Sequence, residues 1–152
     1  MTEEETEARK RADVAKEYRD GQIVVRWEPS YCIHVANCLR GHPGVFDAQA
    51  RPWIRLDQGD ADRIAEAIMT CPSGALSFER VDGGPQEEPP EETVVVPQPD
   101  GPLFVHGRLA IIREDGSVRA TTRATLCRCG YSANKPFCDL THLRAGFRSG
   151  EG

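Results

Sequence analysis

Three cysteines and one histidine lie within sixteen residues in the C-terminal third of the sequence. They follow the order Cys-x-Cys, Pro-x-Cys and x3-His, and they are Cys127, Cys129, Cys138 and His142. Three thiolates and one imidazole can hold a soft metal centre, either an iron–sulfur cluster or zinc. Asp139 is a favourable N-cap, so a helix that begins there would place Cys138 and His142 on one side. The stretch therefore predicts a metal site.

The residues between these ligands help to distinguish an iron–sulfur cluster from zinc. Ser132, Pro136 and Asp139 fall at positions that zinc coordination would not require. The stretch resembles the CDGSH iron–sulfur family, of the mitoNEET type, although Leu140 stands where that family usually has glycine. The resemblance implies that the four ligands hold a 2Fe-2S cluster in a β-rich domain, and it implies no catalytic residue. From the ligand types alone, a structural zinc site stays open.

A second group of cysteines lies in the N-terminal half. The bacterial ferredoxin run is Cys-x2-Cys-x2-Cys, and a distant Cys-Pro completes the site when there is one cluster. Laid on that template, Cys32 is the first ligand, Cys38 the third and Cys71, followed by Pro72, the remote one. The second position is Val35, which cannot bind metal. The three cysteines therefore predict a cluster site that lacks one thiolate.

Residues 23–78 resemble the divergent mono-cluster 4Fe-4S ferredoxin domain, in which this spacing and a Cys-Pro-x-Gly-Ala-Leu ending recur. The resemblance implies a cluster on Cys32, Cys38 and Cys71. Its nuclearity stays open, because three thiolates suit a 3Fe-4S centre, whereas a 4Fe-4S centre needs a further ligand. His34 is one candidate for that ligand, and water or hydroxide is another. Buried structural thiols are the alternative without a metal.

The two groups together use all six cysteines of the chain, which indicates two separate metal sites. A disulfide framework would suit a secreted chain, but the first five residues are acidic rather than signal-like. No apolar run reaches the length of a membrane span, and a net charge of −5 argues against nucleic-acid binding. We therefore expect a soluble, cytoplasmic protein with no membrane or nucleic-acid partner.

The elements expected around the N-terminal cysteine group form a small α+β domain, residues 21–80. Strands are predicted at 22–27, 52–56 and 76–79, from their β-branched and aromatic content. Between them, Asp60 would cap a helix reaching Met69. One face of this helix is apolar and should be buried, comprising Ala61, Ile64, Ala65 and Ile68. Residues 1–20 form a charged segment, read as a short exposed helix or a mobile tail.

The C-terminal cysteine group belongs to a β-rich domain, residues 101–152, after an acidic, proline-rich linker at 81–100. Residues 93–96 could rejoin the sheet, and strands are expected at 103–105 and 108–113. Asp115-Gly116 predicts a hairpin, and residues 118–126 alternate as a half-buried strand with Val118 and Ala120 on its apolar side. The segment after His142 should pack Leu143 and Phe147 onto the metal site.

These expectations favour a two-cluster iron–sulfur protein that passes single electrons between redox protein partners, a reductase and an acceptor. An iron–sulfur cluster donor, or a redox or iron sensor, is the first alternative, and a structural zinc protein is the second. We do not expect an enzyme, because no nucleophile–base pair or phosphate-binding glycine loop is present in the sequence. A homodimer through the C-terminal β region is implied by the resemblance, and a monomer is the alternative.

Overall fold

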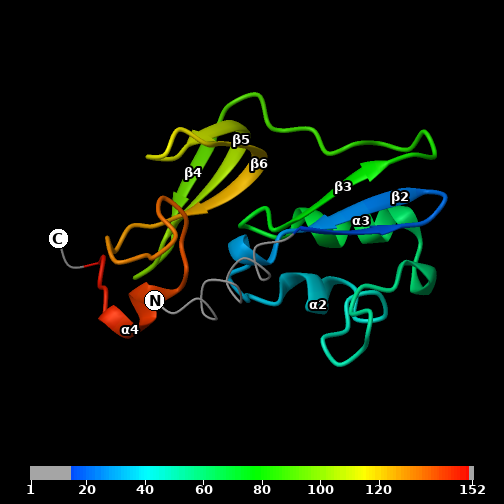
Figure 1. Cartoon of the computed structure of the whole chain (residues 1–152), viewed down its shortest axis with the longest axis horizontal. Coiled ribbons are helices and arrows are strands. Elements are labelled where there is room, and N and C mark those ends of the chain that lie inside the picture. Colours follow the sequence, from blue (N-terminus) through cyan, green and yellow to red (C-terminus); the bar gives the residue numbers. More distant parts are fainter. Residues whose placement is uncertain (1–14, 151–152) are drawn as a thin grey trace. The chain divides into compact units, whose positions relative to one another are not determined.

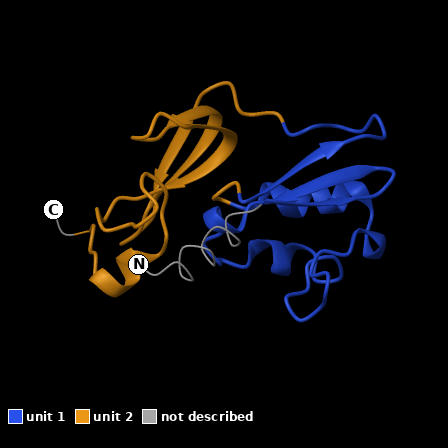
Figure 2. Cartoon of the chain, in the orientation of Figure 1, with its two compact units in different colours: residues 1–71, 75–87 blue, residues 72–74, 88–152 orange. Residues whose placement is uncertain are grey.

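The computed structural model describes residues 15–150, which divide into two compact units. The first unit runs to Cys71 and includes residues 75–87, and the second comprises residues 72–74 and 88–150 (Figure 2). Each unit contains an antiparallel three-stranded sheet, accompanied by helices (Figure 1). The predicted α+β class is confirmed. The structure has a helix-bearing first unit and a β-rich second unit.

The first unit is built on the sheet β1-β2-β3. The strands are β1 (Lys16–Arg19), β2 (Ile23–Trp27) and β3 (Leu76–Arg80), and the chain between β2 and β3 forms η1 (Pro29–Tyr31), α2 (Asn37–Gly41), η2 (Leu56–Gln58) and α3 (Ala61–Met69). The Asp60 carboxylate caps α3 by accepting the Arg63 N–H at 2.9 Å, as predicted. The predicted apolar face of α3 is buried, and the helix packs against β3 (Figure 1).

Two expectations for the first unit were wrong. Residues 16–19 form β1 rather than a helix or tail, and Lys16 pairs with Trp27 in antiparallel register; the remainder of the predicted charged segment, 1–14, lies outside the described residues. The predicted strand 52–56 is reduced to a single bridge between Phe46 and Ile54, followed by η2. Pro52 lacks a backbone N–H for a strand ladder, which explains why pairing stays local.

The second unit contains the sheet β4-β5-β6 and one short helix. The elements are β4 (Val94–Pro97), β5 (Leu103–Ile112), β6 (Val118–Leu126) and α4 (Thr141–Ala145). β4 falls inside the predicted linker 81–100 and pairs with β5. The two strands expected in 103–113 are one strand, with a register shift between His106 and Leu109. At the predicted hairpin, Gly116 takes a φ of +87°, a conformation that glycine permits.

The buried face of β6 differs from the prediction. Arg119 and Arg123 are 9% and 4% exposed, whereas Val118 is 62% exposed. The Phe137 ring explains part of this reversal, because the guanidinium carbons of Arg113 and Arg119 lie 5.7 and 5.8 Å from its centroid. Cation–π contact and burial of the aliphatic stems let arginine occupy positions that alternation assigns to the polar, solvated face.

Candidate metal centres

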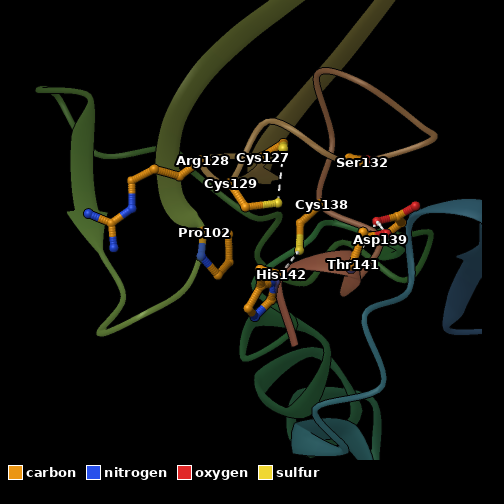
Figure 3. A pocket seen from close by; sticks show the side chains of 9 residues that line it. All are labelled: Pro102, Cys127, Arg128, Cys129, Ser132, Cys138, Asp139, Thr141 and His142. Carbon is orange, nitrogen blue, oxygen red and sulfur yellow. Dashed lines mark hydrogen bonds between the residues drawn. The ribbon is translucent and has the colours of Figure 1, made fainter. Parts of the chain in front are cut away.

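β6 delivers the chain directly to the C-terminal ligands. Beyond Leu126 the chain loops out and returns, so that the Cys127 N–H donates to the Pro136 carbonyl at 2.8 Å. The Cys138 N–H donates to the Thr125 carbonyl at 2.9 Å, beside a bridge between Leu126 and Phe137. This return places Cys138 next to the Cys-x-Cys segment, and Figure 3 shows the side chains facing one another.

The four C-terminal ligands form two close pairs. The sulfurs of Cys127 and Cys129 lie 3.9 Å apart, and Cys138 Sγ lies 3.6 Å from His142 Nδ1. Two ligands of one tetrahedral ion lie about 3.8 Å apart for two sulfurs and about 3.6 Å apart for sulfur and nitrogen, from bond lengths of about 2.3 and 2.05 Å. Each pair therefore fits one metal ion. Within residues 15–150, no three His, Cys, Asp or Glu side chains form a single-ion site.

Backbone N–H groups point at all three C-terminal sulfurs. The donors, at 3.3, 3.4 and 3.3 Å, are Gly130 to Cys127, Tyr131 to Cys129 and Leu140 to Cys138. N–H groups directed at a sulfur favour its thiolate form, since a partial positive charge then faces the negative sulfur. The loop is therefore arranged to hold thiolates, the form in which cysteine binds metal.

The pKa values of two of these thiols move in opposite directions. Burial acts to raise the pKa of Cys127, but the N–H donors of Ser132 and Gly130 outweigh it, so this pKa is lowered. Burial raises the pKa of Cys138, and the Leu140 N–H opposes that shift without cancelling it. Cys138 therefore relies more on the metal than Cys127 does to become a thiolate.

Two polar side chains between the ligands fix the shape of the loop. Ser132 Oγ donates to the Phe137 carbonyl at 2.5 Å and accepts the Asn134 N–H at 3.0 Å. The Asp139 carboxylate accepts the Ala133 N–H at 2.9 Å. These contacts give Ser132 and Asp139 structural roles, consistent with their appearance in the sequence pattern beside the ligands.

The helix that carries His142 begins one residue later than predicted. Leu140, with a φ of +71°, is the N-cap of α4, and Asp139 lies before it. The Asp139 carboxylate still accepts the Thr141 N–H at 3.0 Å, one residue past the cap. Leu140 thus turns the chain between Cys138 and His142 with a left-handed residue, where the CDGSH pattern usually has glycine.

The sequence did not identify the turn that precedes β5 as part of this site. Arg128 Nε donates to the Gly101 carbonyl at 2.8 Å, and Pro102 lines the same hollow as the ligands (Figure 3). A Cβ on Gly101 would lie 3.7 Å from His142 Nε2. The Gly101-Pro102 dipeptide, which is typical of a turn, was the sequence feature that could have indicated this segment. Of the two predicted packing residues, Leu143 is 69% exposed, so the prediction was wrong for Leu143. Phe147 is half-buried, and its ring centroid lies 5.3 Å from the guanidinium carbon of Arg128, which lines the site.

The three cysteines of the first unit are half-buried and gather from separate elements. Cys32 follows η1, Cys38 is in α2, and Cys71 follows α3, where its N–H donates to the Ile68 carbonyl at 3.0 Å. Burial, followed by the charge of Cys71, raises the pKa of Cys38 to about 11. Burial also raises the pKa of Cys32, with Cys71 contributing. Cys32 and Cys38 are therefore protonated thiols at neutral pH, and metal binding must displace their protons.

The loop around the missing ligand is tightly wound. His34 and Ala36 have φ of 56° and 63°, on either side of Val35. His34 Nδ1 lies 3.8 Å from Cys32 Sγ, a separation that suits two ligands of one ion. A four-iron cluster takes one protein ligand for each iron, so His34, paired this closely with Cys32, is not placed here as the ligand of a separate iron. Its role as fourth ligand stays a prediction.

Comparison with known proteins agrees with these two sites. A family described as "Divergent 4Fe-4S mono-cluster" matches residues 18–80, and one described as "Iron-binding zinc finger CDGSH type" matches residues 100–143. The protein named "Uncharacterized protein YjdI" of Escherichia coli strain K12 is 38% identical over 61 residues, covering 40% of this chain and 80% of that protein. The protein of the same name from Escherichia coli O157:H7 matches to the same extent.

The chain belongs to the divergent 4Fe-4S mono-cluster family and carries, in addition, a CDGSH-type iron-binding domain. Both predicted resemblances are confirmed, and both domains are of kinds that bind iron–sulfur clusters. Among the helices of residues 15–150, none is long and apolar enough to cross a membrane.

Proposed function

We propose that this protein is an electron carrier with two unlike iron–sulfur clusters, exchanging single electrons with redox protein partners. Cys127, Cys129, Cys138 and His142 would hold a 2Fe-2S cluster. Cys32, Cys38 and Cys71 would hold a 3Fe-4S or 4Fe-4S cluster. When bound, such clusters accept and release one electron at a time.

The pairing of the C-terminal ligands is the observation that carries this proposal. The sulfurs of Cys127 and Cys129 lie 3.9 Å apart, and Cys138 Sγ lies 3.6 Å from His142 Nδ1, so each pair would supply two protein ligands to one iron. The hollow that they line has a cavity volume of about 0 Å³, so it has no room for a free small molecule, whose sites usually measure about 300–1,000 Å³. A site that receives only an electron needs no substrate cavity beside it, so we propose no catalytic role here.

The C-terminal side chains would also set the ease of reduction. A neutral imidazole at His142 leaves less negative charge around the metal than a fourth thiolate would, which favours the reduced state. Arg128 lies between Cys127 and Cys129 in the sequence. Its guanidinium is held by hydrogen bonds that it donates to the carbonyls of Gly101 and Gln98, at 2.8 and 2.6 Å. This fixed positive charge acts in the same direction as the imidazole.

We propose a cytoplasmic location on the basis of cysteine usage. All six cysteines have free thiols, and a reducing compartment would keep them available as metal ligands. The reductase and acceptor would be proteins, since Cys127 and Cys129 are only half-buried and an electron could pass to a protein docked beside them.

Mixing the reduced protein with an oxidised ferredoxin tests the proposal. We expect the acceptor to become reduced while the protein keeps its iron and sulfide through repeated cycles. A second incubation, with apo-ferredoxin, tests the cluster-donor alternative. Movement of iron and sulfide to the apo-ferredoxin, without reduction of the oxidised acceptor, would replace the electron carrier with a cluster donor.

A further inference from the structure

The short segment that follows Cys71 is attached to the sheet of the second unit. Residues 72–74 belong to that unit, whereas Cys71 belongs to the first (Figure 2). Gly74 is buried and has a φ of +71°, and a Cβ placed on it would lie 2.3 Å from the carbonyl oxygen of Arg123 on β6. Only glycine permits so close a backbone approach in this conformation. The chain therefore passes from a proposed cluster ligand directly into a tight contact with β6.

The side chain of Arg119 holds this segment in place. Arg119 Nη2 donates to the Gly74 carbonyl at 3.0 Å, and the arginine is 9% exposed. A hydrogen bond from a charged donor is roughly twice as strong as one between neutral groups. A buried carbonyl that loses its donor also keeps the full cost of its desolvation. Arg119 is therefore a strong point of attachment for the segment that begins at Cys71.

The same guanidinium lies on a ring next to a C-terminal ligand. Its carbon is 5.8 Å from the centroid of Phe137, which is 2% exposed and directly precedes Cys138. Phe137 also forms a bridge with Leu126, the residue before Cys127. All of these contacts lie within the second unit. One buried arginine thus touches the segment that follows one proposed metal ligand and the ring that adjoins another.

We infer that Arg119 is a positioning residue that couples the two metal centres, an inference that rests on the proposed function. A cluster on Cys71 restricts the start of segment 72–74, and Arg119 carries this restriction to Phe137 and Cys138. Binding that orders a shared segment lowers the ordering cost left to the second site, so each cluster favours the other. The factor is the same in both directions. We expect about fivefold, at the lower end of typical coupling, so each centre still forms alone.

A double-mutant cycle on cluster retention in the full-length, cluster-loaded protein tests this coupling. Cys32→Ser disables the N-terminal centre at a ligand remote in sequence from the attached segment. The probe is bathophenanthroline disulfonate, an iron chelator, and the readout is the EPR signal of the reduced 2Fe-2S centre. We expect Cys32→Ser to lower about fivefold the chelator concentration that removes half of this signal. In the Arg119→Met background, Cys32→Ser should cause no further change, because the two substitutions remove the same link.

Two matched pairs of variants separate the link from general destabilisation. Arg113 lies on the same ring, 5.7 Å from the centroid of Phe137, but its Nη2 donates to Asn134 rather than to Gly74. Arg113→Met should therefore keep the fivefold effect of disabling the N-terminal centre. Gly74→Ala detaches the segment from the other side and should abolish that effect. Gly83→Ala is its control, because Gly83 has a φ of +85° and open space at its Cβ position.

Each outcome supports or overturns the coupling. Additive effects of Cys32→Ser and Arg119→Met, with full iron in both centres of the unaltered protein, would overturn it and leave the two clusters standing. A coupling that survives Gly74→Ala would also overturn it, even if Arg119→Met failed to fold. An unaltered protein without iron in the N-terminal centre would refute that cluster and the coupling together. Failure of the electron carrier would appear separately, as a ferredoxin that stays oxidised beside two retained clusters.

Discussion

Leu140 shows how one residue between two ligands carries a conformational cost. Its φ of +71° lies in the left-handed region, which costs a side chain with a Cβ about 1–2 kcal/mol. The turn is nevertheless needed, because it lets the Leu140 N–H reach Cys138 Sγ at 3.3 Å and starts the helix of His142. The packing that holds this turn must therefore outweigh the strain.

We predict that Leu140→Gly stabilises the second unit by about 1 kcal/mol, since glycine adopts this conformation without a Cβ penalty. The measurement is the free energy of unfolding in urea, followed by loss of cluster absorbance. Gly146 ends the same helix with a φ of +70° and open space around its Cβ position. Gly146→Ala is the matched reverse change and should destabilise by a similar amount; a stabilising effect there would remove the strain explanation.

His142→Cys addresses the ligand that distinguishes the C-terminal centre. A fourth thiolate adds a negative charge, so we predict a reduction potential lower by on the order of 100 mV, with a cluster still present. Redox titration monitored by EPR measures the change. His106→Cys is the control, because His106 is an exposed residue of β5. A potential unaffected by His142→Cys would show that His142 does not bind the metal.

At the scale of elements, one buried arginine ties the end of β3 to the start of α3. The Arg80 side chain is 6% exposed and donates to Asp62 at 2.7 Å and to Asp82 at 3.0 and 2.8 Å. Hydrogen bonds from Arg80, followed by that from the Gly84 N–H, lower the pKa of Asp82 from 3.8 to about 2. The two carboxylates thus satisfy a guanidinium that would be costly to bury without partners.

We predict that Asp82→Asn destabilises the first unit at neutral pH and that this difference disappears in acid. Because the folded pKa is depressed, the contribution of Asp82 is present above about pH 4 and is lost as the pH falls toward about 2. Urea unfolding followed by tryptophan fluorescence at pH 7 and at pH 2 measures it. Asp57→Asn, at an exposed carboxylate of η2, is the control. An equal effect of Asp82→Asn at both pH values would contradict this linkage.

Local sequence rules predicted those elements whose signals are local. Asp60 and the spacing of Ile64 and Ile68 were sufficient for α3, because capping and amphipathic packing depend on nearby residues. The buried arginines of β6 could not be predicted in this way. Arg119 is buried in part because it packs on Phe137, eighteen positions later, and alternation contains no information about that contact.

The candidate sites likewise contain some features that local sequence signals predict and others that depend on long-range contacts. Ligand spacing predicted both cysteine groups, and the structure brings the C-terminal ligands together in two close pairs. The turn at Gly101 was not predicted as part of the C-terminal site, because it meets His142 only in the folded chain.

At the scale of the whole molecule, the homodimer remains a proposal that β4 supports. Val94, Val95 and Val96 are 46%, 52% and 48% exposed, on a strand at the edge of its sheet. An exposed apolar edge strand can pair with another chain. We expect Val95→Lys to convert a dimer to a monomer in light scattering, whereas Ile112→Lys, outside β4, should not. A monomeric unaltered protein would exclude the homodimer.

The central claim is that one chain holds two separate iron–sulfur clusters, and metal and sulfide analysis with EPR of the anaerobically purified protein tests it most directly. The proposed cofactors require two irons for the C-terminal centre and three or four for the N-terminal one, with acid-labile sulfide at both. Cys138→Ser should remove only the 2Fe-2S signal, and Cys71→Ser only the other. Zinc without sulfide in the C-terminal centre, or loss of both signals from either single substitution, would contradict two independent clusters.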